Sequence, residues 1–558
     1  MTYHAKHTEA FGEHESVELL SQHYLDDEEG GTVYLSQHSE KVDGRRGLRS
    51  YFRTLRLQSS LLSRLRGWLV FAFVQLLPSF VASRYFPHVR CTPLPRAKIH
   101  PTSWLDGLRG VAAMAVIAFH WTERVLGMGN PGYGEPRSGR SNSLLQLPIL
   151  HLSFSGAANV AIFFAVSGYA LSVRPVQLMV DPKGNGAKAM RSIGSSIFRR
   201  FFRLYLPAFA SMIPQFLWDV LEMNTRLDRW HMGAFVSTDY MKAVEELHMP
   251  IYDNRASVPH HISARNAQSS FLQPRGAENM FMTEFSKLVT ANLKSVTIFE
   301  GSWAQNQYNN PYNYALWTIP IEFRASLMLF LVQLALYQVR PNIRMMITFG
   351  LMLFSVYADR YEMILFLGGF LLAQLDPVIL AIEDRVARVR PRGARVYSVL
   401  LTCFFVGGLF LASFPQWNAV ETPGFIWLAH HIPTWCKWNR NWFWITIGAM
   451  LVVFTISRLQ LLINFFHLPV IQYLGQISFS IYLVHLIIQT VFGVPFMYYF
   501  GSWTTNLDRY NSRVFGFGYF MSMLYIWALC IWFGDLWCRF VDIPSVKFTK
   551  WLEAKILV

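Results

Sequence analysis

The sequence is poor in charge and in cysteine, and both shortages restrict the class of protein. Only 15% of its 558 residues are Asp, Glu, Lys or Arg, whereas about a quarter is usual in soluble domains. The hydrophobic fraction of 52% and the mean hydropathy of +0.24 exclude a disordered chain. The five cysteines are too few for a disulfide scaffold and show no metal-ligand spacing. The class that remains is an all-α, polytopic membrane protein.

Several signatures of other functions are missing as well. The sequence has no Gly-x-Ser-x-Gly elbow for a covalent acyl-enzyme, and no block occurs twice, as the repeats of many transporters do. The net charge of +15 would suggest nucleic acid in a soluble protein. In a membrane protein such a surplus belongs to basic loops and anionic lipid, so we expect a lipid bilayer and no nucleic acid as partner.

Apolar runs long enough to cross a bilayer recur along the chain. A hydrocarbon core of ~30 Å needs about 20 residues of helix. The runs that qualify are 104–123, 153–173, 201–221, 316–338, 343–358, 361–381, 397–414, 442–463, 476–500 and 514–540. They predict about ten core transmembrane helices in a membrane domain at 100–540, with a long non-cytosolic loop at 222–311.

The basic residues alternate between the connections and predict an orientation. The positive-inside rule places the connections richest in Arg and Lys in the cytosol, and both termini with them. We expect a disordered cytosolic tail at 1–60, which is acidic and then basic, and a cytosolic C-terminal tail at 541–558. The expected location is an endomembrane, such as the endoplasmic reticulum, or the plasma membrane.

The segment 61–99 has two interpretations. Its apolar part, 67–82, is short, contains Pro78 and has arginines on both sides. Cations at both ends favour an amphipathic or interfacial helix. An extra transmembrane segment is the alternative.

Ionisable side chains inside apolar runs are costly and mark functional sites. In the first run Asp106, Arg109 and His120 share roughly one helix face, because eleven residues make about three turns. Arg109 is expected near the cytosolic interface, and His120 about 16 Å deeper. This order suits a long anionic ligand that enters from the cytosol and reacts at its tip. A snorkelling arginine and a structural histidine are the alternative.

Polar residues in other runs extend this set. They are Ser167 and Tyr169 in the second run, Arg200 and Arg203 at the start of the third, Glu322 in the fourth, and Tyr482 and His485 in the ninth. The arginine pair can clamp phosphates or simply anchor its helix. A buried Glu322 needs a partner, either Arg324 or a group on another helix.

Five blocks in order carry a family resemblance. They are Leu105-Asp106-Gly107-Leu108-Arg109-Gly110 followed by His120, Phe163-Phe164 with Ser167-Gly168-Tyr169, Arg199-Arg200 with Arg203, Leu316-Trp317 with Glu322, and Leu474-Gly475 with Ser478, Ser480, Tyr482 and His485. In these blocks the sequence resembles the integral-membrane acyltransferase 3 family over roughly residues 100–540. The N-terminal tail and the Pro-Ile-Glu-Phe-Arg form of the fourth block look like the fungal branch. Phe323 departs from the second acid that bacterial members often carry there.

The resemblance implies transfer of an acyl group, usually acetyl, from acyl-CoA to a hydroxyl, with no tightly bound cofactor and no metal. Arg109, Arg200 and Arg203 are expected to hold the phosphates of acyl-CoA. His120 is the expected general base, with Glu322 and Asp106 as further catalytic candidates. Ser167, Tyr169, Tyr482 and His485 are the candidates for contacting the substrate or the oxyanion.

The acceptor is expected to be a small hydrophobic alcohol, such as a terpenoid or polyketide of secondary metabolism. The chain shows no added catalytic domain of the kind that some carbohydrate-modifying relatives carry. Acylation of a carbohydrate or a lipid is the alternative within the same chemistry. A proton-coupled transporter is the alternative from another class, because intramembrane His, Glu and Arg also build proton relays.

Overall fold

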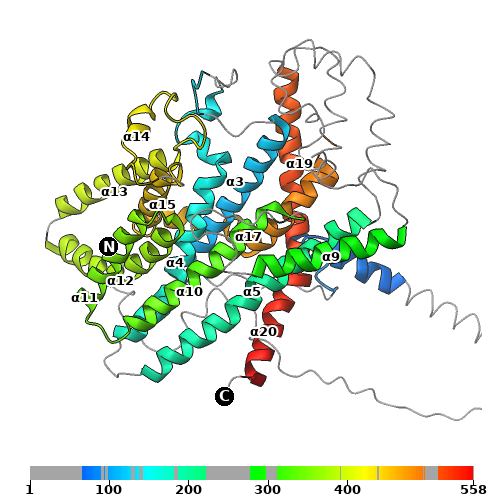
Figure 1. The fold of residues 1–558 in the computed structure, drawn as a ribbon, viewed down its shortest axis with the longest axis horizontal. Helices are drawn as coiled ribbons and strands as arrows, with labels where there is room; N and C mark the ends of the chain where they lie inside the picture. The colour runs from blue at the N-terminus through cyan, green and yellow to red at the C-terminus, as the bar shows by residue number, and fades with distance from the viewer. Residues whose placement is uncertain are drawn as a thin grey trace, which may run out of the picture.

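The computed structural model describes residues 66–89, 94, 99–126, 132–136, 143–180, 186–220, 277–296, 310, 312–389, 391–436, 439–493, 496 and 513–556. Within these ranges the regular secondary structure is helical and contains no strand (Figure 1), as predicted. The predicted tail at 1–60 lies outside the described residues, and so does most of the loop 222–311.

Long helices form the body of the molecule. In chain order they are α3 (Trp104–Leu126), α4 (Gly156–Val180), α5 (Gly186–Val220), α10 (Thr318–Ala335), α11 (Pro341–Tyr357), α12 (Tyr361–Val389), α13 (Pro391–Ala412), α15 (Trp442–Ile456), α17 (Pro469–Ile488) and α19 (Arg513–Trp537). Each of the ten predicted runs falls on one of them. The other helices are α2 (Ser79–Tyr85), α9 (Ala277–Val296), α14 (Ile426–His430), α16 (Gln460–Phe466) and α20 (Ile543–Ile556), with η3 (Tyr314–Trp317) before α10.

The number of spans is smaller when length and hydropathy are both required. Among the described residues six helices are long and apolar enough to cross a membrane, and a seventh span results if the bent pair α15–α16 counts as one. The helix α11 has only 17 residues, and α3 and α5 contain the ionisable side chains discussed below. The count of ten therefore stays a prediction.

The predicted run 442–463 is not one straight helix. It consists of α15 and α16, which meet at an angle of 93°. Arg458 lies at this bend, and its guanidinium bonds the Asp376 carboxylate of α12 at 2.6 Å. A charged residue with a partner on another helix fixes a bend that hydropathy alone does not reveal.

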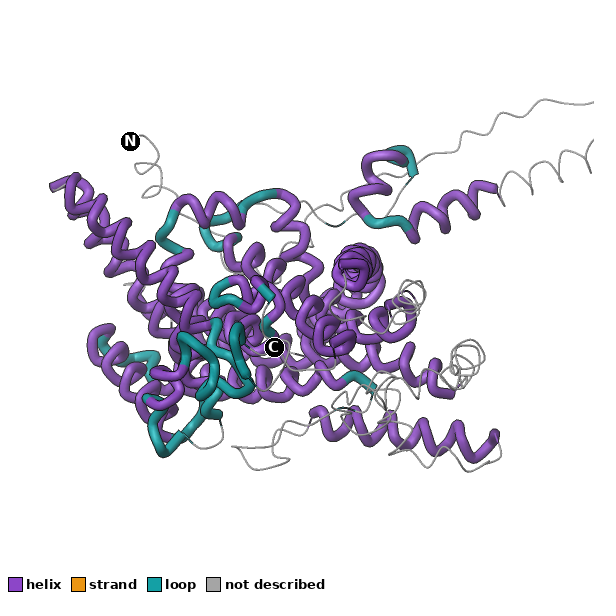
Figure 2. Tube along the Cα trace, turned by 90° about the horizontal axis from the view of Figure 1, so that it is seen from above, coloured by secondary structure: helices purple, strands orange, loops and turns teal. Residues whose placement is uncertain are grey.

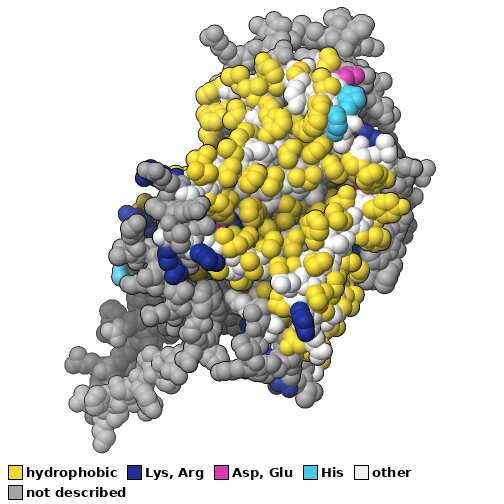
Figure 3. All heavy atoms as spheres, turned by 90° about the vertical axis from the view of Figure 1, so that its left-hand side faces the viewer, with side chains coloured by type: hydrophobic (Ala, Val, Ile, Leu, Met, Phe, Trp, Pro, Cys, Tyr) yellow, Lys and Arg dark blue, Asp and Glu magenta, His cyan; other side chains and the backbone are white. Residues whose placement is uncertain are grey.

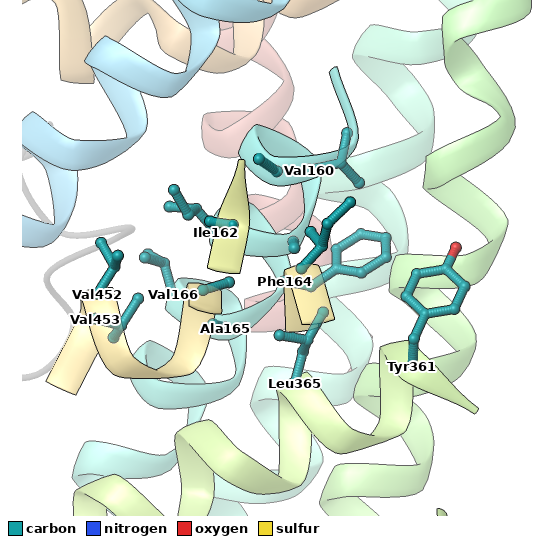
Figure 4. Close-up of a cluster of buried hydrophobic side chains, with 14 of the residues drawn as sticks. Val160, Ile162, Phe164, Ala165, Val166, Tyr361, Leu365, Val452 and Val453 are labelled. Atoms are coloured by element: carbon teal, nitrogen blue, oxygen red, sulfur yellow. The ribbon is translucent and has the colours of Figure 1, made fainter. Parts of the chain in front are cut away.

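Small residues allow the helices that build the site to approach closely. A Cβ on Gly475 of α17 would lie 2.3 Å from the backbone oxygen of Asp106 on α3, and one on Gly110 would lie 2.6 Å from the backbone nitrogen of Gly475. Glycine is needed at both positions, since any side chain would push α3 and α17 apart. The α4–α12–α15 core beside them is apolar, with Phe164, Leu365 and Val452 among its buried residues (Figure 4).

The outer surface agrees with a bilayer as the surrounding medium. One face of the molecule is covered almost entirely by hydrophobic side chains (Figure 3). Exposed examples are Met346 and Phe354 on α11 and Val399 and Phe404 on α13. An apolar surface of this extent would make a soluble protein aggregate, which supports a multi-pass membrane protein.

Both ends of the described chain pack against the bundle. The C-terminal segment, predicted only as a tail, forms α20, which contacts α5, and Glu553 pairs with Arg199 at 3.5 Å.

Two further segments are helical where no core helix is predicted. The helix α9 lies within the predicted loop 222–311 and packs against α5 and α10. The segment 61–99 forms two short helices, Arg66–Leu76 and α2, on either side of Pro78.

Candidate active site

One face of α10 and its leading turn carries three polar residues. Tyr314, Thr318 and Glu322 are spaced by four, so they lie above one another on one side of the helix. This side faces α3, α17 and α5, because Tyr314 contacts His120, Thr318 contacts Tyr482 and Glu322 contacts Arg200. The site is therefore a column of polar contacts inside the helix bundle.

His120 lies at one end of this column and is 9% exposed. Its Nδ1 is 3.0 Å from the Tyr314 hydroxyl and 3.5 Å from a carboxylate oxygen of Glu123. A carboxylate accepts hydrogen bonds only, so its contact favours a proton on Nδ1. Nε2 is then the nitrogen that can take a proton from a substrate.

His485 is fully buried and stacks on His120. The ring centroids are 5.3 Å apart and the planes differ by 28°. Nδ1 of His485 lies 2.7 Å from the backbone oxygen of Tyr482, and since a carbonyl only accepts, this nitrogen carries the proton. The contact of His485 with substrate or oxyanion stays a prediction.

The turn that carries Tyr314 is fastened to α17. The Tyr482 hydroxyl bonds the backbone oxygen of Ala315 and lies 2.6 Å from the Thr318 hydroxyl. The Asn313 side chain donates to the backbone oxygen of Leu483 at 2.9 Å. Tyr482 thus holds η3 in place and, through it, Tyr314 against His120.

Glu322 forms the other end of the column. Its carboxylate accepts hydrogen bonds from Arg200 at 2.7 Å and from the Ser167 hydroxyl at 3.0 Å. Tyr314 and Glu322 are separated by about 12–14 Å along the axis, so the groups that touch Nδ1 of His120 are Tyr314 and Glu123. Of the two partners predicted for Glu322, the structure shows the group on another helix, Arg200 of α5. Arg324 interacts electrostatically with Arg360 and Glu362.

The three arginines predicted to bind phosphate approach one another from α3 and α5. Arg109 lies within electrostatic range of Arg200, and both Arg109 and Arg203 lie within range of the Asp542 carboxylate. Asp106 is 3.8 Å from Arg109. Each arginine thus has an acid nearby, so a phosphate bound here would compete with Asp106, Glu322 and Asp542.

Tyr169 belongs to a different cluster. Its hydroxyl bonds the Asp376 carboxylate of α12, which also pairs with Arg458. Ser167, two residues earlier on α4, points to Glu322. Of the two α4 candidates, the structure places only Ser167 in the column, whereas Tyr169 helps to join α4 to the α15–α16 bend.

Sequence reasoning missed Tyr314, Thr318 and Asp542. The spacing of Tyr314 and Thr318 from Glu322 is a helical signal that was present in the sequence. Asp542 follows the last predicted span, and only tertiary packing brings it to Arg109 and Arg203.

The thiol of Cys436 is not activated. Burial and the neighbouring Asp359 carboxylate raise the pKa of the Cys436 thiol to about 12, which disfavours the reactive thiolate. In the part of the chain that the structure describes, no three His, Cys, Asp or Glu side chains are grouped as a metal site.

Comparison with known proteins identifies the family of this chain. The family described as "Acyltransferase domain" (acyltransferase 3) matches residues 102–532. The chain is 28% identical to the O-acetyltransferase PaAT-1 of Phomopsis amygdali over 476 residues, which cover 83% of this chain and 86% of that protein. It is 26% identical to the acyltransferase clz18 of Cochliobolus lunatus over 492 residues, covering 82% and 96%. No solved structure matches. The chain belongs to the integral-membrane acyltransferase 3 family, and its relatives are fungal acyltransferases.

Proposed function

We propose that the protein is a membrane-bound O-acyltransferase that moves an acyl group, most simply acetyl, from acyl-CoA to a hydroxyl of a small hydrophobic metabolite. The observation that carries the proposal is His120, buried within the matched family region with its Nδ1 held by Tyr314 and Glu123. The name of the relative PaAT-1 supports acetyl as the acyl group.

In the proposed reaction His120 is the general base. Its Nε2 removes the proton of the acceptor hydroxyl while the hydroxyl oxygen attacks the thioester carbonyl. The tetrahedral oxyanion collapses, the carbon–sulfur bond breaks, and the CoA thiolate leaves. The proton held by His120 then returns to the thiolate, so the products are the ester and free CoA.

The neighbours of His120 support this role. Its imidazolium form has two protonated nitrogens, and the one at Nδ1 meets the Tyr314 oxygen and the Glu123 carboxylate. The neutral His485 ring stacked on it adds an aromatic face to the charge. These contacts strengthen as the charge forms, as transition-state stabilisation requires.

The phosphates of acyl-CoA are proposed to bind at the arginine cluster, which consists of Arg109, Arg200 and Arg203. Arg109 lies about three turns of α3 from His120, or ~16 Å along the axis. Arg200 lies within electrostatic range of Arg109, and Arg203 within range of the Asp542 carboxylate that Arg109 also reaches. The separation between Arg109 and His120 suits the extended arm between the phosphates and the thioester of acyl-CoA. Glu322 and Asp106 are then residues that position arginines, and the phosphates displace part of their interactions.

The acceptor is proposed to enter from the lipid. His120 lies among α3, α17 and the turn before α10, surrounded by apolar helix surface. A terpenoid or polyketide alcohol is apolar enough to pass from the lipid into the apolar surroundings of His120. We further propose that both termini lie in the cytosol and that the membrane is the endoplasmic reticulum or the plasma membrane.

The test uses microsomes that contain the full chain, labelled acetyl-CoA and a panel of candidate alcohols. We expect His120→Ala to abolish transfer of label. His430→Ala is the matched control, because His430 is exposed and bonds only within its own helix turn in the described contacts. An abundant, folded His120→Ala protein that transfers label at the full rate would refute the role of His120 as general base. In a separate arm, Arg203→Ala should raise KM for acetyl-CoA, and an unchanged KM would refute the donor site.

A further inference from the structure

The two short helices before the matched family region carry a large exposed apolar surface. Trp68 is 74% exposed, and Leu69, Phe71, Phe73 and Phe80 are also exposed. Only a narrow opposite face is buried, with Val74 and Ala82 at 0%. In a water-soluble element this arrangement would be unstable, because the larger apolar side chains face outward.

The bend between these helices is locked to the end of α19. The backbone N–H of Ser79 donates to the Asp535 carboxylate at 3.0 Å, and Arg539 donates to the backbone oxygen of Leu77 at 2.6 Å. Asp535 and Arg539 form a buried ion pair at 2.6 Å, with both side chains fully buried. Trp532 donates to the backbone oxygen of Leu76 at 2.7 Å. The outward surface therefore has a fixed place in the fold.

The locked segment is too short to span and extends to the side. The helix Arg66–Leu76 has eleven residues, about 16 Å of rise against a hydrocarbon core of ~30 Å. The two helices, dark blue in Figure 1, project from the edge of the bundle beside α19 at a steep angle to that helix, and Figure 2 shows the same edge from above. Both the segment and the ion pair that holds it lie outside the family match at 102–532.

The charge around this surface has a single sign. Residues 44–105 contain no Asp or Glu. The cations there are Arg45, Arg46, Arg49, Arg53, Arg56, Arg64, Arg66, Arg84, Arg90, Arg96 and Lys98. Arg66 and Arg84 are exposed at the two ends of the helix pair. An apolar face bordered by arginines complements acyl chains below a layer of negative headgroups.

We propose that residues 66–89 form a lipid-binding surface that lies in the headgroup region of the bilayer and recruits anionic phospholipids. The exposed aromatic side chains enter the upper acyl region, and Arg66 and Arg84 bind the phosphates. The Asp535–Arg539 pair fixes the depth of this surface relative to α19. The proposal is independent of acyl transfer.

The experiment places one fluorophore in the full-length chain reconstituted in nanodiscs. The test protein carries Phe71→Cys with Cys91→Ser and Cys403→Ser. The matched control keeps Cys403, which is exposed on α13 near the middle of the span Arg395–Ala412, and carries Cys91→Ser alone. Trp68→Cys replaces Phe71→Cys if the first variant does not fold. The remaining described cysteines are buried.

Lipids with nitroxides at different depths report where each fluorophore lies. We expect a nitroxide near the headgroup to quench the label at position 71 more than one deep in the acyl chain, and the opposite order at Cys403. At equal mole fraction, nitroxide-labelled phosphatidylserine should quench position 71 about two- to fivefold more than phosphatidylcholine. Arg66→Gln with Arg84→Gln should reduce this excess, and Arg440→Gln, an exposed arginine elsewhere, should not.

Three results would overturn the proposal. The first is a label at position 71 that water-soluble iodide quenches and lipid nitroxides do not. The second is equal quenching by phosphatidylserine and phosphatidylcholine. The third is a phosphatidylserine excess that appears only after removal of residues 1–40, which would assign the arginines to the acidic tail in the intact chain.

Discussion

Removal of a single hydroxyl, in Tyr314→Phe, tests how His120 is held. The Tyr314 hydroxyl lies 3.0 Å from Nδ1 of His120, and the two rings meet edge to face with centroids 5.1 Å apart. Phenylalanine keeps this ring contact. The turn also stays in place, because Asn313 and Tyr482 fasten it to α17. The change therefore removes the polar contact with His120 and keeps the ring contact.

The expected effect follows from the charge on His120 in the transition state. A hydrogen bond to a charged group contributes about 1.5–3 kcal/mol, against 0.5–1.5 kcal/mol for a neutral pair. Because the neutral bond already exists before the reaction, kcat loses only the difference of about 1–1.5 kcal/mol. With 1.36 kcal/mol per factor of ten, Tyr314→Phe should lower kcat by about 5- to 12-fold. The arginine cluster is untouched, so KM for acetyl-CoA should not change.

The assay is transfer of label from acetyl-CoA to an accepted alcohol, with kcat and KM measured for both substrates. Tyr519→Phe is the matched control, because the Tyr519 hydroxyl bonds Thr122 on α3, two residues beyond His120. It removes the same group beside the same helix without touching the imidazole. A fall in kcat of less than twofold for Tyr314→Phe, or an equal fall in both variants, would refute the positioning role.

Three further changes test the surroundings of the site. Gly475→Ala places a Cβ 2.3 Å from the Asp106 oxygen, so overpacking by about 1–3 kcal/mol should separate α3 from α17 and lower kcat at least tenfold; unchanged kinetics would contradict the close approach. Asp542→Asn removes an acid beside two arginines and should lower KM for acetyl-CoA about two- to fivefold, the effect of a screened pair; a raised KM would count against the phosphate site. Asp535→Asn leaves a buried guanidinium without its carboxylate and should destabilise the fold by about 3–5 kcal/mol, seen as a lower thermal midpoint of the purified protein; an unchanged midpoint would show that the pair is dispensable.

Much of the fold could be predicted because the bilayer imposes a simple rule on the sequence. A long apolar run has to become a helix in lipid, where unpaired backbone groups cost several kcal/mol each. Each predicted run accordingly overlaps a helix, and the run 442–463 overlaps two. The bend between α15 and α16 could not be predicted, because it depends on Arg458 meeting Asp376 from a distant part of the chain.

The sequence predicted which residues belong to the candidate site better than it predicted which of them contact one another. His120, Glu322 and Arg200 stood out because ionisable residues are rare in apolar runs. Their pairing was a different matter. Glu322 was expected to pair with Arg324 or with another helix, and it accepts hydrogen bonds from Arg200 and Ser167. The residue beside His120 is Tyr314, which lies in a turn rich in tyrosine and asparagine.

The sequence by itself determined the class of protein, the helices and the family, since these depend on composition, on apolar length and on motifs that are local in the chain. Only the tertiary structure decided which acid meets which base. Contacts such as Tyr314 with His120 join residues 194 positions apart, and a helix register fixes which side chains share a face but not which helix that face will meet. The glycines of α3 and α17 supply that information, because they let two particular helices come close enough for their histidines to stack.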